Sequence, residues 1–286
     1  MNPGPPPGAS QAPPPPSRHY ENFPVASLLC PPRLRPAVAA IYGFARTADD
    51  IADEGDAPPA QRLQDLAEYR ADLQIAAEGR SSSARWPEVF GALQPMLAQF
   101  HLPVALLADL LSAFEQDVVK QRYASEAELL DYCRRSANPV GRLLLHLYAI
   151  NDAESLAQSD NICSALQLIN FWQDLSVDIP RGRIYLPQDI WAEHGVDEAQ
   201  LLGLDVNPNT AKLTATCADS ARARMLKGSP LVKKVPGRAG WELRLVVQGG
   251  LRILDKITAI NFATLRQRPT LNAWDVAVMV WRALRM

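Results

Sequence analysis

The chain lacks the features of secreted, disulfide-bonded and membrane-spanning proteins. Its 286 residues include only four cysteines, and no two of them form a Cys-x-x-Cys pair or stand at zinc-site spacing from histidine. A reduced, cytoplasmic compartment is therefore expected. No stretch of 18 apolar residues predicts a transmembrane helix. The segment 1–17 has neither the charged start nor the apolar centre of a signal peptide.

Nucleotide-binding and nucleic-acid-binding signatures are also missing. Neither Gly-x-Gly-x-x-Gly nor the phosphate loop Gly-x-x-x-x-Gly-Lys occurs, so a Rossmann-type cofactor site is not expected. The formal net charge is −2, which gives no global attraction for nucleic acid. An anionic substrate would therefore need a local device, such as a metal ion or an arginine cluster. No feature of the sequence specifies an oligomeric state.

Apolar residues recur at helical spacing from His19 onwards, and strand signals are nearly absent. Residues 1–17, with eight prolines, are expected to form a disordered tail. Residues 18–286 are predicted to form a single all-α domain. Ser125 and Glu128 have the spacing of a helix capping box. The predicted helical segments are 34–53, 60–78, 87–100, 103–123, 142–150, 152–178, 209–227, 241–262 and 274–285, with an irregular stretch at 181–203.

Two pairs of aspartates stand about half the chain apart, each at i and i+4 spacing. Asp49 and Asp53 form the first pair, and Asp174 and Asp178 form the second. Residues four apart lie one above the other on one helical face, where like charges destabilise an isolated helix. A positive group should therefore offset each pair, and two such faces across a cavity would hold hard divalent cations. The alternative for a single pair is a solvated helix face.

Each pair continues into a polar stripe within otherwise apolar sequence. Tyr42 and Arg46 precede the first pair at one-turn intervals, as Gln167 and Asn170 precede the second. The apolar neighbours predict burial, where unpaired carboxylates are costly. Mg²⁺ prefers oxygen ligands and is usually held by one or two carboxylates together with substrate phosphates. The predicted Mg²⁺ ligands are Asp49, Asp53, Asn170, Asp174 and Asp178.

Three segments resemble the squalene/phytoene synthase family of isoprenoid enzymes. They are residues 46–53 (Arg-Thr-Ala-Asp-Asp-Ile-Ala-Asp), 132–141 (Tyr-Cys-Arg-Arg-Ser-Ala-Asn-Pro-Val-Gly) and 170–187, which begins Asn-Phe-Trp-Gln-Asp-Leu-Ser-Val-Asp. The likeness extends from residue 19 past the second pair, and more loosely over the last third of the chain. It implies an all-α isoprenoid synthase (prenyltransferase) fold with a central cavity. It also implies that both aspartate motifs bind Mg²⁺ and the diphosphate of a prenyl diphosphate substrate.

The resemblance implies substrate contacts around the two pairs, each with a structural alternative. Arg46 would clamp the diphosphate or simply neutralise the neighbouring carboxylates. Tyr42 and Tyr132 would orient phosphate oxygens or stabilise a cation, unless they are buried rings with satisfied hydroxyls. Arg183 and Tyr185 would close over the second pair or anchor a loop. The candidates for substrate contact are His19, Tyr42, Arg46, Gln167, Asn170, Arg183 and Tyr185.

Within the family, the chain most resembles the hopanoid-pathway members that convert presqualene diphosphate and water into hydroxysqualene. Residues 19–27 (His-Tyr-Glu-Asn-Phe-Pro-Val-Ala-Ser) and the dipeptide Asn138-Pro139 carry this likeness. Most head-to-head synthases have small residues in the place of Asn138, and an amide there would hold the water that ends the reaction. The catalytic candidates are Asp49, Asp53, Tyr132, Asn138, Asp174 and Asp178.

Two other functions stay open at this point. One is a different head-to-head reaction that yields presqualene diphosphate, squalene or phytoene. The other is a non-catalytic assembly factor on the same scaffold, which the presence of all four aspartates disfavours. The segment 273–286 combines Trp274 and Trp281 with two arginines. It would either pack against the core, the favoured alternative, or lie on the inner face of a membrane as a peripheral contact.

Overall fold

Helices make up nearly all the regular structure that can be described. The computed structural model describes residues 30–80 and 83–286. Within these ranges no β-strand occurs, and one isolated parallel bridge joins Arg122 to Ile184. The predicted all-α class is confirmed, whereas the tail 1–17 lies outside the described residues. The helices are α1 (Arg35–Asp53), α2 (Pro59–Ala77), α3 (Pro87–Phe100), α4 (Val104–Val119), α5 (Glu126–Ser136), α6 (Asn138–Leu147), α7 (Ala153–Gln173), α8 (Leu175–Asp178), η1 (Ile179–Arg181), α9 (Gln188–Glu193), α10 (Glu198–Leu202), α11 (Pro208–Gly228), η2 (Ser229–Lys233), α12 (Gly237–Ala259) and α13 (Ala273–Ala283).

Helix ends agree with the predictions where a capping side chain marks them. They differ from the predictions where contacts with distant residues determine the end of a helix. The Ser125 hydroxyl accepts a hydrogen bond from the backbone N–H of Glu128 at 3.2 Å, as the capping spacing predicted. The single helix predicted over 152–178 is wrong, because the backbone turns at Asp174 (φ −103°, ψ 14°). The N–H of Ser176 then donates to the carbonyl of Thr264 at 3.2 Å instead of continuing the helix. The stretch 181–203 is also more regular than predicted, since it contains α9 and α10.

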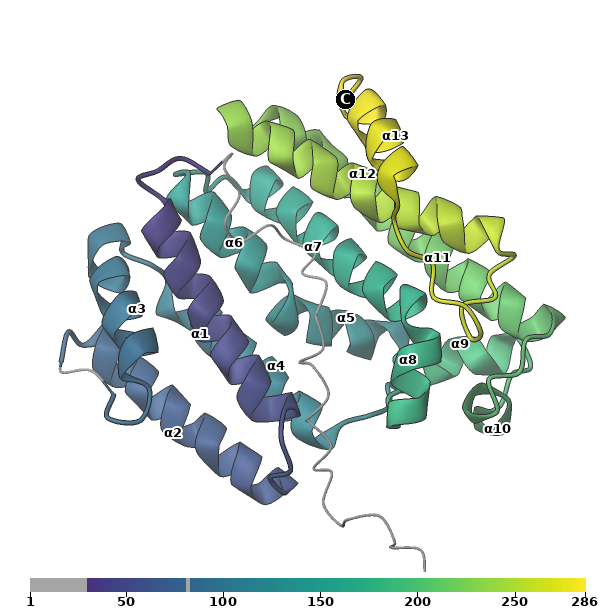
Figure 1. Cartoon of the computed structure of the whole chain (residues 1–286), viewed down its shortest axis with the longest axis horizontal. Helices are drawn as coiled ribbons and strands as arrows, with labels where there is room; N and C mark the ends of the chain where they lie inside the picture. The colour runs from purple at the N-terminus through teal and green to yellow at the C-terminus, as the bar shows by residue number, and fades with distance from the viewer. Residues whose placement is uncertain (1–29, 81–82) are drawn as a thin grey trace, which may run out of the picture.

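Two hydrophobic cores lie on either side of α6. The first joins α1 to α4, and the rings of Phe44, Tyr69 and Phe90 meet at its centre. The second joins α5, α7, α11 and α12. Helix α6 is shared, with Leu143 in the first core and Leu145 in the second. Figure 1 shows this order, with α1 to α3 on one side, α6 and α7 in the middle and α11 to α13 on the other.

Close packing of α6 on α7 depends on a glycine. A Cβ atom built at Gly141 would stand 2.4 Å from the Ser159 hydroxyl and 2.5 Å from the Cys163 sulfur. Contacts this short do not occur between real side chains, so any larger residue would push the two helices apart. Gly141 therefore fixes the spacing of the two helices that border the central cavity.

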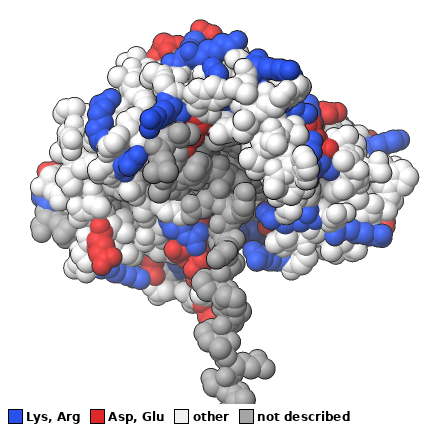
Figure 2. All heavy atoms as spheres, turned by 45° about the horizontal axis from the view of Figure 1, so that its top comes forward, with Lys and Arg blue, Asp and Glu red and all other residues white. Residues whose placement is uncertain are grey.

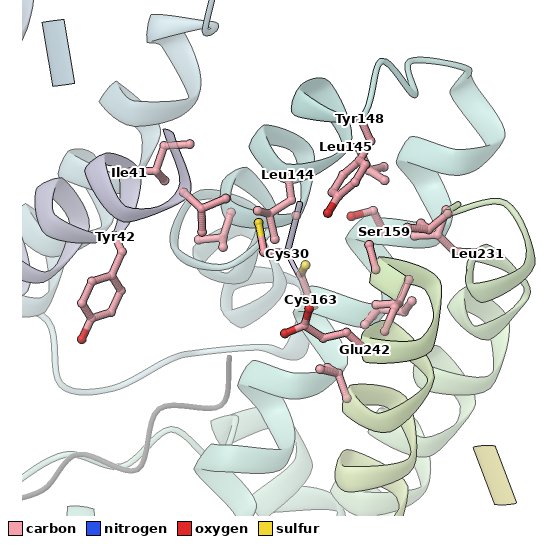
Figure 3. Close-up of a pocket in the computed structure, with 18 of the residues that line it drawn as sticks. Cys30, Ile41, Tyr42, Leu144, Leu145, Tyr148, Ser159, Cys163, Leu231 and Glu242 are labelled. Atoms are coloured by element: carbon pink, nitrogen blue, oxygen red, sulfur yellow. The ribbon is translucent and has the colours of Figure 1, made fainter. Parts of the chain in front are cut away.

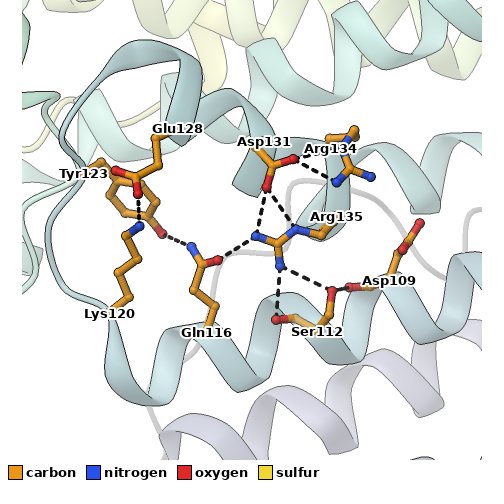
Figure 4. Close-up of polar contacts among 9 residues, drawn as sticks. All are labelled: Asp109, Ser112, Gln116, Lys120, Tyr123, Glu128, Asp131, Arg134 and Arg135. Atoms are coloured by element: carbon orange, nitrogen blue, oxygen red, sulfur yellow. Dashed lines mark hydrogen bonds and ion pairs between the residues drawn. The ribbon is translucent and has the colours of Figure 1, made fainter.

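A polar network ties α5 to α4 beside the second core (Figure 4). Arg135 donates to the side chain of Gln116 at 2.6 Å and to the carbonyl of Ser112 at 3.2 Å. It also pairs with Asp131 on its own helix. Gln116 in turn donates to the Tyr123 hydroxyl at 3.2 Å. Charge-assisted bonds of this kind orient α4, which carries a further site residue one position after Gln116.

The C-terminal helix α13 runs along α12 but leaves most of its apolar side chains in solvent. Within α13 only Asp275 and Ala283 are buried. Trp274 is 82% exposed and Trp281 is 54% exposed. The favoured prediction that this stripe packs against the core is therefore wrong, because its one acidic residue is drawn inwards by two cations of α12. None of the helices described, α13 included, has the length and apolarity needed to cross a bilayer.

Candidate active site

One face of α1 is apolar at its start and acidic at its end. Val38, Tyr42 and Ala45 lie on it and line a cavity. Asp49 and Asp53 follow on the same face at the next two turns. At 1.5 Å per residue, the 15 steps from the first to the last of these residues span about 22 Å. The helix therefore connects an apolar chamber with a carboxylate pair.

Helix α7 repeats this arrangement across the cavity. Ser159 and Cys163 line the same chamber. Gln167, Asn170 and Asp174 continue the face towards the end of the helix at spacings of four, three and four residues. The amide side chains of Gln167 and Asn170 are half-buried and have no hydrogen-bond partner within residues 30–80 and 83–286. The second stripe thus also runs from apolar to polar, and its amides are available to a ligand.

An apolar cavity of about 310 Å³ lies between the apolar halves of these two stripes. Its remaining walls come from α6, η2 and α12, and they are mainly Leu, Val and Ile side chains. Figure 3 shows Ile41, Leu144 and Leu145 around it, with the Tyr42 hydroxyl pointing away from the other labelled side chains. The volume lies at the lower end of the range for ligand pockets in proteins. Such a chamber accepts hydrocarbon, and Glu242 is the one charged residue among its described lining residues.

An arginine on its own helix neutralises the first carboxylate pair. Arg46 makes ion pairs of 2.7 Å with Asp50, 2.8 Å with Glu54 and 3.4 Å with Asp49. The expected positive partner is thereby found. The predicted burial is wrong for this pair, since the Asp49 side chain is 45% exposed and that of Asp53 is 34% exposed. These carboxylates lie beyond the residues that line the cavity, where solvent reduces the cost of their charge.

The second pair is neutralised from a distant segment. Asp174 accepts two hydrogen bonds from Arg268. The Nε–H donates to Oδ1, and a terminal N–H donates to Oδ2 at 3.2 Å. The segment that carries Arg268 is fixed to α7 by a hydrogen bond of 2.6 Å from the Gln173 amide to the Pro269 carbonyl. Asp178 lies on α8, where burial and the nearby Asp174 raise its pKa to about 6. Arg268 could not be predicted from local spacing, because 94 residues separate it from its partner.

Arg183 brings the two pairs together. Its guanidinium makes an ion pair with Asp53 of the first pair. Its backbone N–H donates to the carbonyl of Asp178 at 3.0 Å, and its charge opposes the rise that burial causes in the pKa of the Asp178 carboxyl. The two motifs therefore approach each other at Arg183, which contacts Asp53 through its guanidinium and Asp178 through its backbone. The segment that follows the second pair therefore extends to the first pair, where it places Arg183 beside Asp53.

A fifth carboxylate, missed from the sequence, lies beside this junction. Asp117 of α4 is half-buried, and its Oδ2 accepts a hydrogen bond of 2.8 Å from the Tyr132 hydroxyl. Burial raises the pKa of Asp117 to about 7, although the Tyr132 bond and the Arg183 charge oppose the shift. Its Oδ1 is buried without a hydrogen-bond partner among the described residues. An aspartate in the sequence Phe-Glu-Gln-Asp of an otherwise apolar helix was the available signal.

Four aromatic rings surround the Asp117 side chain and the second motif. Tyr185 stacks on Phe171 with ring centroids 3.7 Å apart, and both rings neighbour Tyr132. Tyr123 completes the group. Burial raises the pKa values of Tyr132 and Tyr185 well above the ordinary tyrosine value. Tyr185 is therefore positioned as a loop anchor, the structural alternative considered for it, and Tyr132 as a hydrogen-bond donor to Asp117.

Asn138 and His19 are the remaining candidate residues, and only Asn138 belongs to the described part of the chain. Asn138 is buried at the start of α6, and its Oδ1 accepts a hydrogen bond of 2.9 Å from the Ser164 hydroxyl. It is not among the residues that line the cavity, although Val140 and Gly141 are. Its amide nitrogen has no hydrogen-bond partner in the described part of the chain. His19 lies outside the described residues.

The donor atoms present fit a magnesium ion that binds together with phosphate. No three His, Cys, Asp or Glu side chains within 30–80 and 83–286 stand close enough to hold a metal alone. The carboxylates are instead divided between two motifs and held by Arg46, Arg183 and Arg268. Mg²⁺ is commonly held by one or two carboxylates while phosphate oxygens and water complete its coordination. The buried, unpartnered Oδ1 of Asp117 is a further oxygen of the type this ion prefers.

An all-helical body with an apolar chamber leading to two acidic motifs defines an isoprenoid synthase fold. The solved structure of squalene synthase HpnC from Alicyclobacillus acidocaldarius superposes with a TM-score of 0.79, at 34% identity over 85% of this chain and 90% of that one. A dehydrosqualene synthase solved with a ligand gives a TM-score of 0.78 at 20% identity, over 90% of this chain and 88% of that one, and supports the fold alone. The family model for squalene/phytoene synthases matches residues 17–275. The chain belongs to the squalene/phytoene synthase family.

Relatives within this family have several named activities. A hydroxysqualene synthase of Sinorhizobium fredii is 34% identical over 241 residues, which cover 84% of this chain and 79% of that protein. A phytoene synthase of Thermus thermophilus is 32% identical over 267 residues, which cover 93% of this chain and 88% of that protein. A presqualene diphosphate synthase of Rhodopseudomonas palustris is 27% identical over 265 residues, covering 92% and 93%. These identities establish the family, but they do not specify which product this chain forms.

Proposed function

We propose that this protein is a Mg²⁺-dependent enzyme that converts presqualene diphosphate and water into hydroxysqualene and diphosphate. The observation that carries the proposal is the pair of stripes on α1 and α7, which join an apolar cavity to two aspartate motifs. An amphiphile with a long hydrocarbon part and an anionic end matches that arrangement. Relatives named hydroxysqualene synthase, at 34–38% identity, support the choice of product.

The charged end of the site serves departure of the diphosphate. The bond between the substrate carbon and the diphosphate oxygen breaks, and its electron pair leaves with the diphosphate. Magnesium, held by Asp49, Asp53, Asn170, Asp174 and Asp178, would supply neutralising charge there. Arg183 and Arg268 now pair with carboxylates. A guanidinium also binds phosphate oxygens in bidentate fashion, so these arginines would exchange one anion for the other when substrate binds.

The apolar end serves the carbocation that remains. Side chains of the cavity keep bulk water away while the carbon skeleton rearranges. A single water then supplies oxygen to the cation, and its proton is released. Asn138 supports this step, since its amide nitrogen has no hydrogen-bond partner in the described residues while its oxygen is held by Ser164. Buried tyrosine rings beside Asp117 provide the electron-rich faces that favour a nearby cation.

The second candidate function is head-to-head condensation of two prenyl diphosphates. Relatives named phytoene synthase and presqualene diphosphate synthase favour it, because they cover more than 90% of this chain. The charged site would serve both reactions, since each begins with the loss of diphosphate. The two functions differ in whether water or a second hydrocarbon chain meets the cation.

Product analysis separates these functions. The purified protein is incubated with presqualene diphosphate, and separately with farnesyl or geranylgeranyl diphosphate, with Mg²⁺ or with EDTA. Products are identified by gas chromatography and mass spectrometry. Hydroxysqualene formed only from presqualene diphosphate and only with Mg²⁺ supports the proposal. Phytoene, squalene or presqualene diphosphate as the sole product would support the second function, and no turnover of any substrate would support a non-catalytic role.

The proposed location is a reducing compartment, at the surface of a membrane. The four cysteines, Cys30, Cys133, Cys163 and Cys217, are all free and buried, as expected where thiols stay reduced. A substrate with a long hydrocarbon part partitions into lipid rather than water. An enzyme that takes such a substrate would therefore work most efficiently where it can touch a bilayer.

A further inference from the structure

Helix α13 presents an unusually apolar outer face for a helix on a protein surface. Trp274, Val276, Val280, Trp281 and Leu284 are 82%, 52%, 42%, 54% and 63% exposed. Their steps along the helix are two, four, one and three residues, which place all five on about one half of its circumference. Isolated exposed apolar residues need no explanation, but a contiguous patch of this kind usually marks an interaction surface. Figure 1 shows α13 at the outer edge of the molecule, beside α12.

The face continues onto α12 through a third tryptophan. Arg252 and Asp255 of α12 make ion pairs with α13, and Gln248 donates a hydrogen bond to Met286 just after it. Trp241 lies about two turns before Gln248 on the same side of α12, and it is 40% exposed. Three of the six tryptophans of the chain therefore belong to one surface, defined here as the tryptophan face: Trp241, Trp274, Val276, Val280, Trp281 and Leu284.

The charges on this surface are basic. The Arg285 guanidinium lies 3.4 Å from the centre of the Trp281 ring, and that of Arg244 lies 5.0 Å from the centre of the Trp241 ring. The only acidic residue in 273–286 is Asp275, whose side chain is 2% exposed and is paired inwards with α12. The space-filling view shows Lys and Arg side chains, with some Asp and Glu side chains, among uncharged surface on the side of the molecule turned forward (Figure 2).

We propose that the tryptophan face docks on the surface of an anionic lipid bilayer. This inference rests on the proposed function, because it gives the route by which a prenyl diphosphate reaches the cavity. Tryptophan concentrates at the membrane–water interface, where its ring lies among headgroups and acyl chains. A helix with an apolar face and flanking basic residues lies flat in that layer, and arginine stems let the charge reach lipid phosphates.

A second copy of the chain fits this surface less well. In a symmetric dimer the same patch meets itself, so Arg285 would approach Arg285, or Arg244, of the partner. Contact between like charges opposes association of the two copies. No exposed acidic residue on α13 offsets it. Anionic lipid phosphates provide the opposite charge without that conflict.

Docking in this orientation connects the bilayer with the cavity. Helix α12 carries Trp241 on its outer side, while Glu242, Leu243 and Val246 of the same segment line the cavity. The hydrocarbon chamber is therefore separated from the tryptophan face by the width of one helix. A lipid-soluble substrate or product would need to travel only that distance to leave or enter the bilayer.

Vesicle binding by the full chain tests the proposal. Vesicles of phosphatidylcholine alone, or with about a third phosphatidylglycerol, are sedimented with the protein, and the bound fraction is measured. The double variant Trp274→Ser and Trp281→Ser should bind the anionic vesicles at least tenfold more weakly than the unchanged protein. The matched control replaces Leu202 and Leu226 by serine, two residues that are 52% and 53% exposed on other helices, and should bind normally. Circular dichroism verifies that both variants are folded.

The charge is tested by replacing Arg244 and Arg285 with glutamine. Each basic residue near an anionic surface contributes about fivefold to binding, so the preference for anionic over neutral vesicles should fall by an order of magnitude. Equal binding by the tryptophan variant and the control would overturn the proposal. So would a concentration-dependent dimer that only the tryptophan variant abolishes, since the face would then be a protein interface.

Turnover in detergent distinguishes this proposal from the proposed function. Presqualene diphosphate dispersed in detergent needs no membrane to reach the cavity. Normal turnover there without vesicle binding contradicts membrane docking and leaves the proposed reaction standing. Vesicle binding without turnover of presqualene diphosphate contradicts the proposed reaction and leaves the membrane surface standing.

Discussion

Replacing Asp117 by asparagine should change how the stability of the protein depends on pH. The carboxyl group is buried, its Oδ1 has no hydrogen-bond partner in the described residues, and its pKa is raised to about 7. In the unfolded chain an aspartate titrates near its ordinary value of about 3.9. The native state therefore holds a proton that the unfolded state has lost, and stability falls as pH rises from about 4 to about 7.

The size of this effect follows from the shift in pKa. A rise from 3.8 to about 7 corresponds to a destabilisation of about 4 kcal/mol at pH 8, since each unit is about 1.4 kcal/mol. At pH 5 the same group destabilises the folded state by only about 1.5 kcal/mol. An asparagine amide in this position is uncharged at every pH, but its N–H₂ would be buried without a partner, which costs about 2 kcal/mol. Asp117→Asn should therefore be about 2 kcal/mol more stable than the unchanged protein at pH 8 and about equal to it at pH 5.

Urea unfolding at pH 5, 6, 7 and 8, with EDTA present to remove divalent cations, measures this difference. Asp109→Asn serves as the control, because Asp109 lies about two turns earlier on the same helix and, unlike Asp117, has no buried oxygen that lacks a hydrogen-bond partner. The difference between the Asp117 variant and the unchanged protein should grow by about 2.5 kcal/mol from pH 5 to pH 8. A difference in unfolding free energy that stays constant with pH, or a variant that is less stable than the unchanged protein at pH 8, would refute the raised pKa of Asp117.

Three further predictions concern the site and its support. Asp53→Asn should lower turnover of presqualene diphosphate by at least 100-fold, whereas Asp56→Asn, in the exposed turn after α1, should leave it unchanged. Asn138→Ala should raise the ratio of hydrocarbon to alcohol products measured by mass spectrometry, and an unchanged ratio would exclude this residue from holding the water. Gly141→Ala should destabilise the fold by about 1–3 kcal/mol in urea, because its Cβ would meet Ser159 and Cys163 at 2.4 and 2.5 Å. Adding Cys163→Ala should restore part of that loss.

Local spacing was enough to find the aspartate motifs and most helices. Asp49 and Asp53 lie on one face because residues four apart always do in a helix, and Pro87 marks the start of α3 as its fixed backbone angle favours. The Ser125 cap was predictable for the same reason, since its partner is three residues away. Features set by neighbours in sequence follow from the sequence directly.

Features set by distant contacts could not be predicted in the same way. The turn at Asp174 depends on Thr264 and Arg268, which approach α8 only in the folded chain. The elevated pKa of Asp117 depends on its burial, on the hydrogen bond from Tyr132 and on charges from two other segments. Periodicity likewise identified the apolar face of α13 but not the side on which it would lie. That side is decided by the ion pairs of Asp275 with Arg252 and Lys256.

The origin of the product oxygen tests the central claim most directly. The protein is incubated with presqualene diphosphate and Mg²⁺ in water enriched in ¹⁸O, and the product is analysed by mass spectrometry. The account predicts hydroxysqualene whose hydroxyl oxygen has the isotope ratio of the solvent, because a water in the cavity meets the cation. An alcohol whose oxygen comes from the diphosphate, or a product without oxygen, would contradict it.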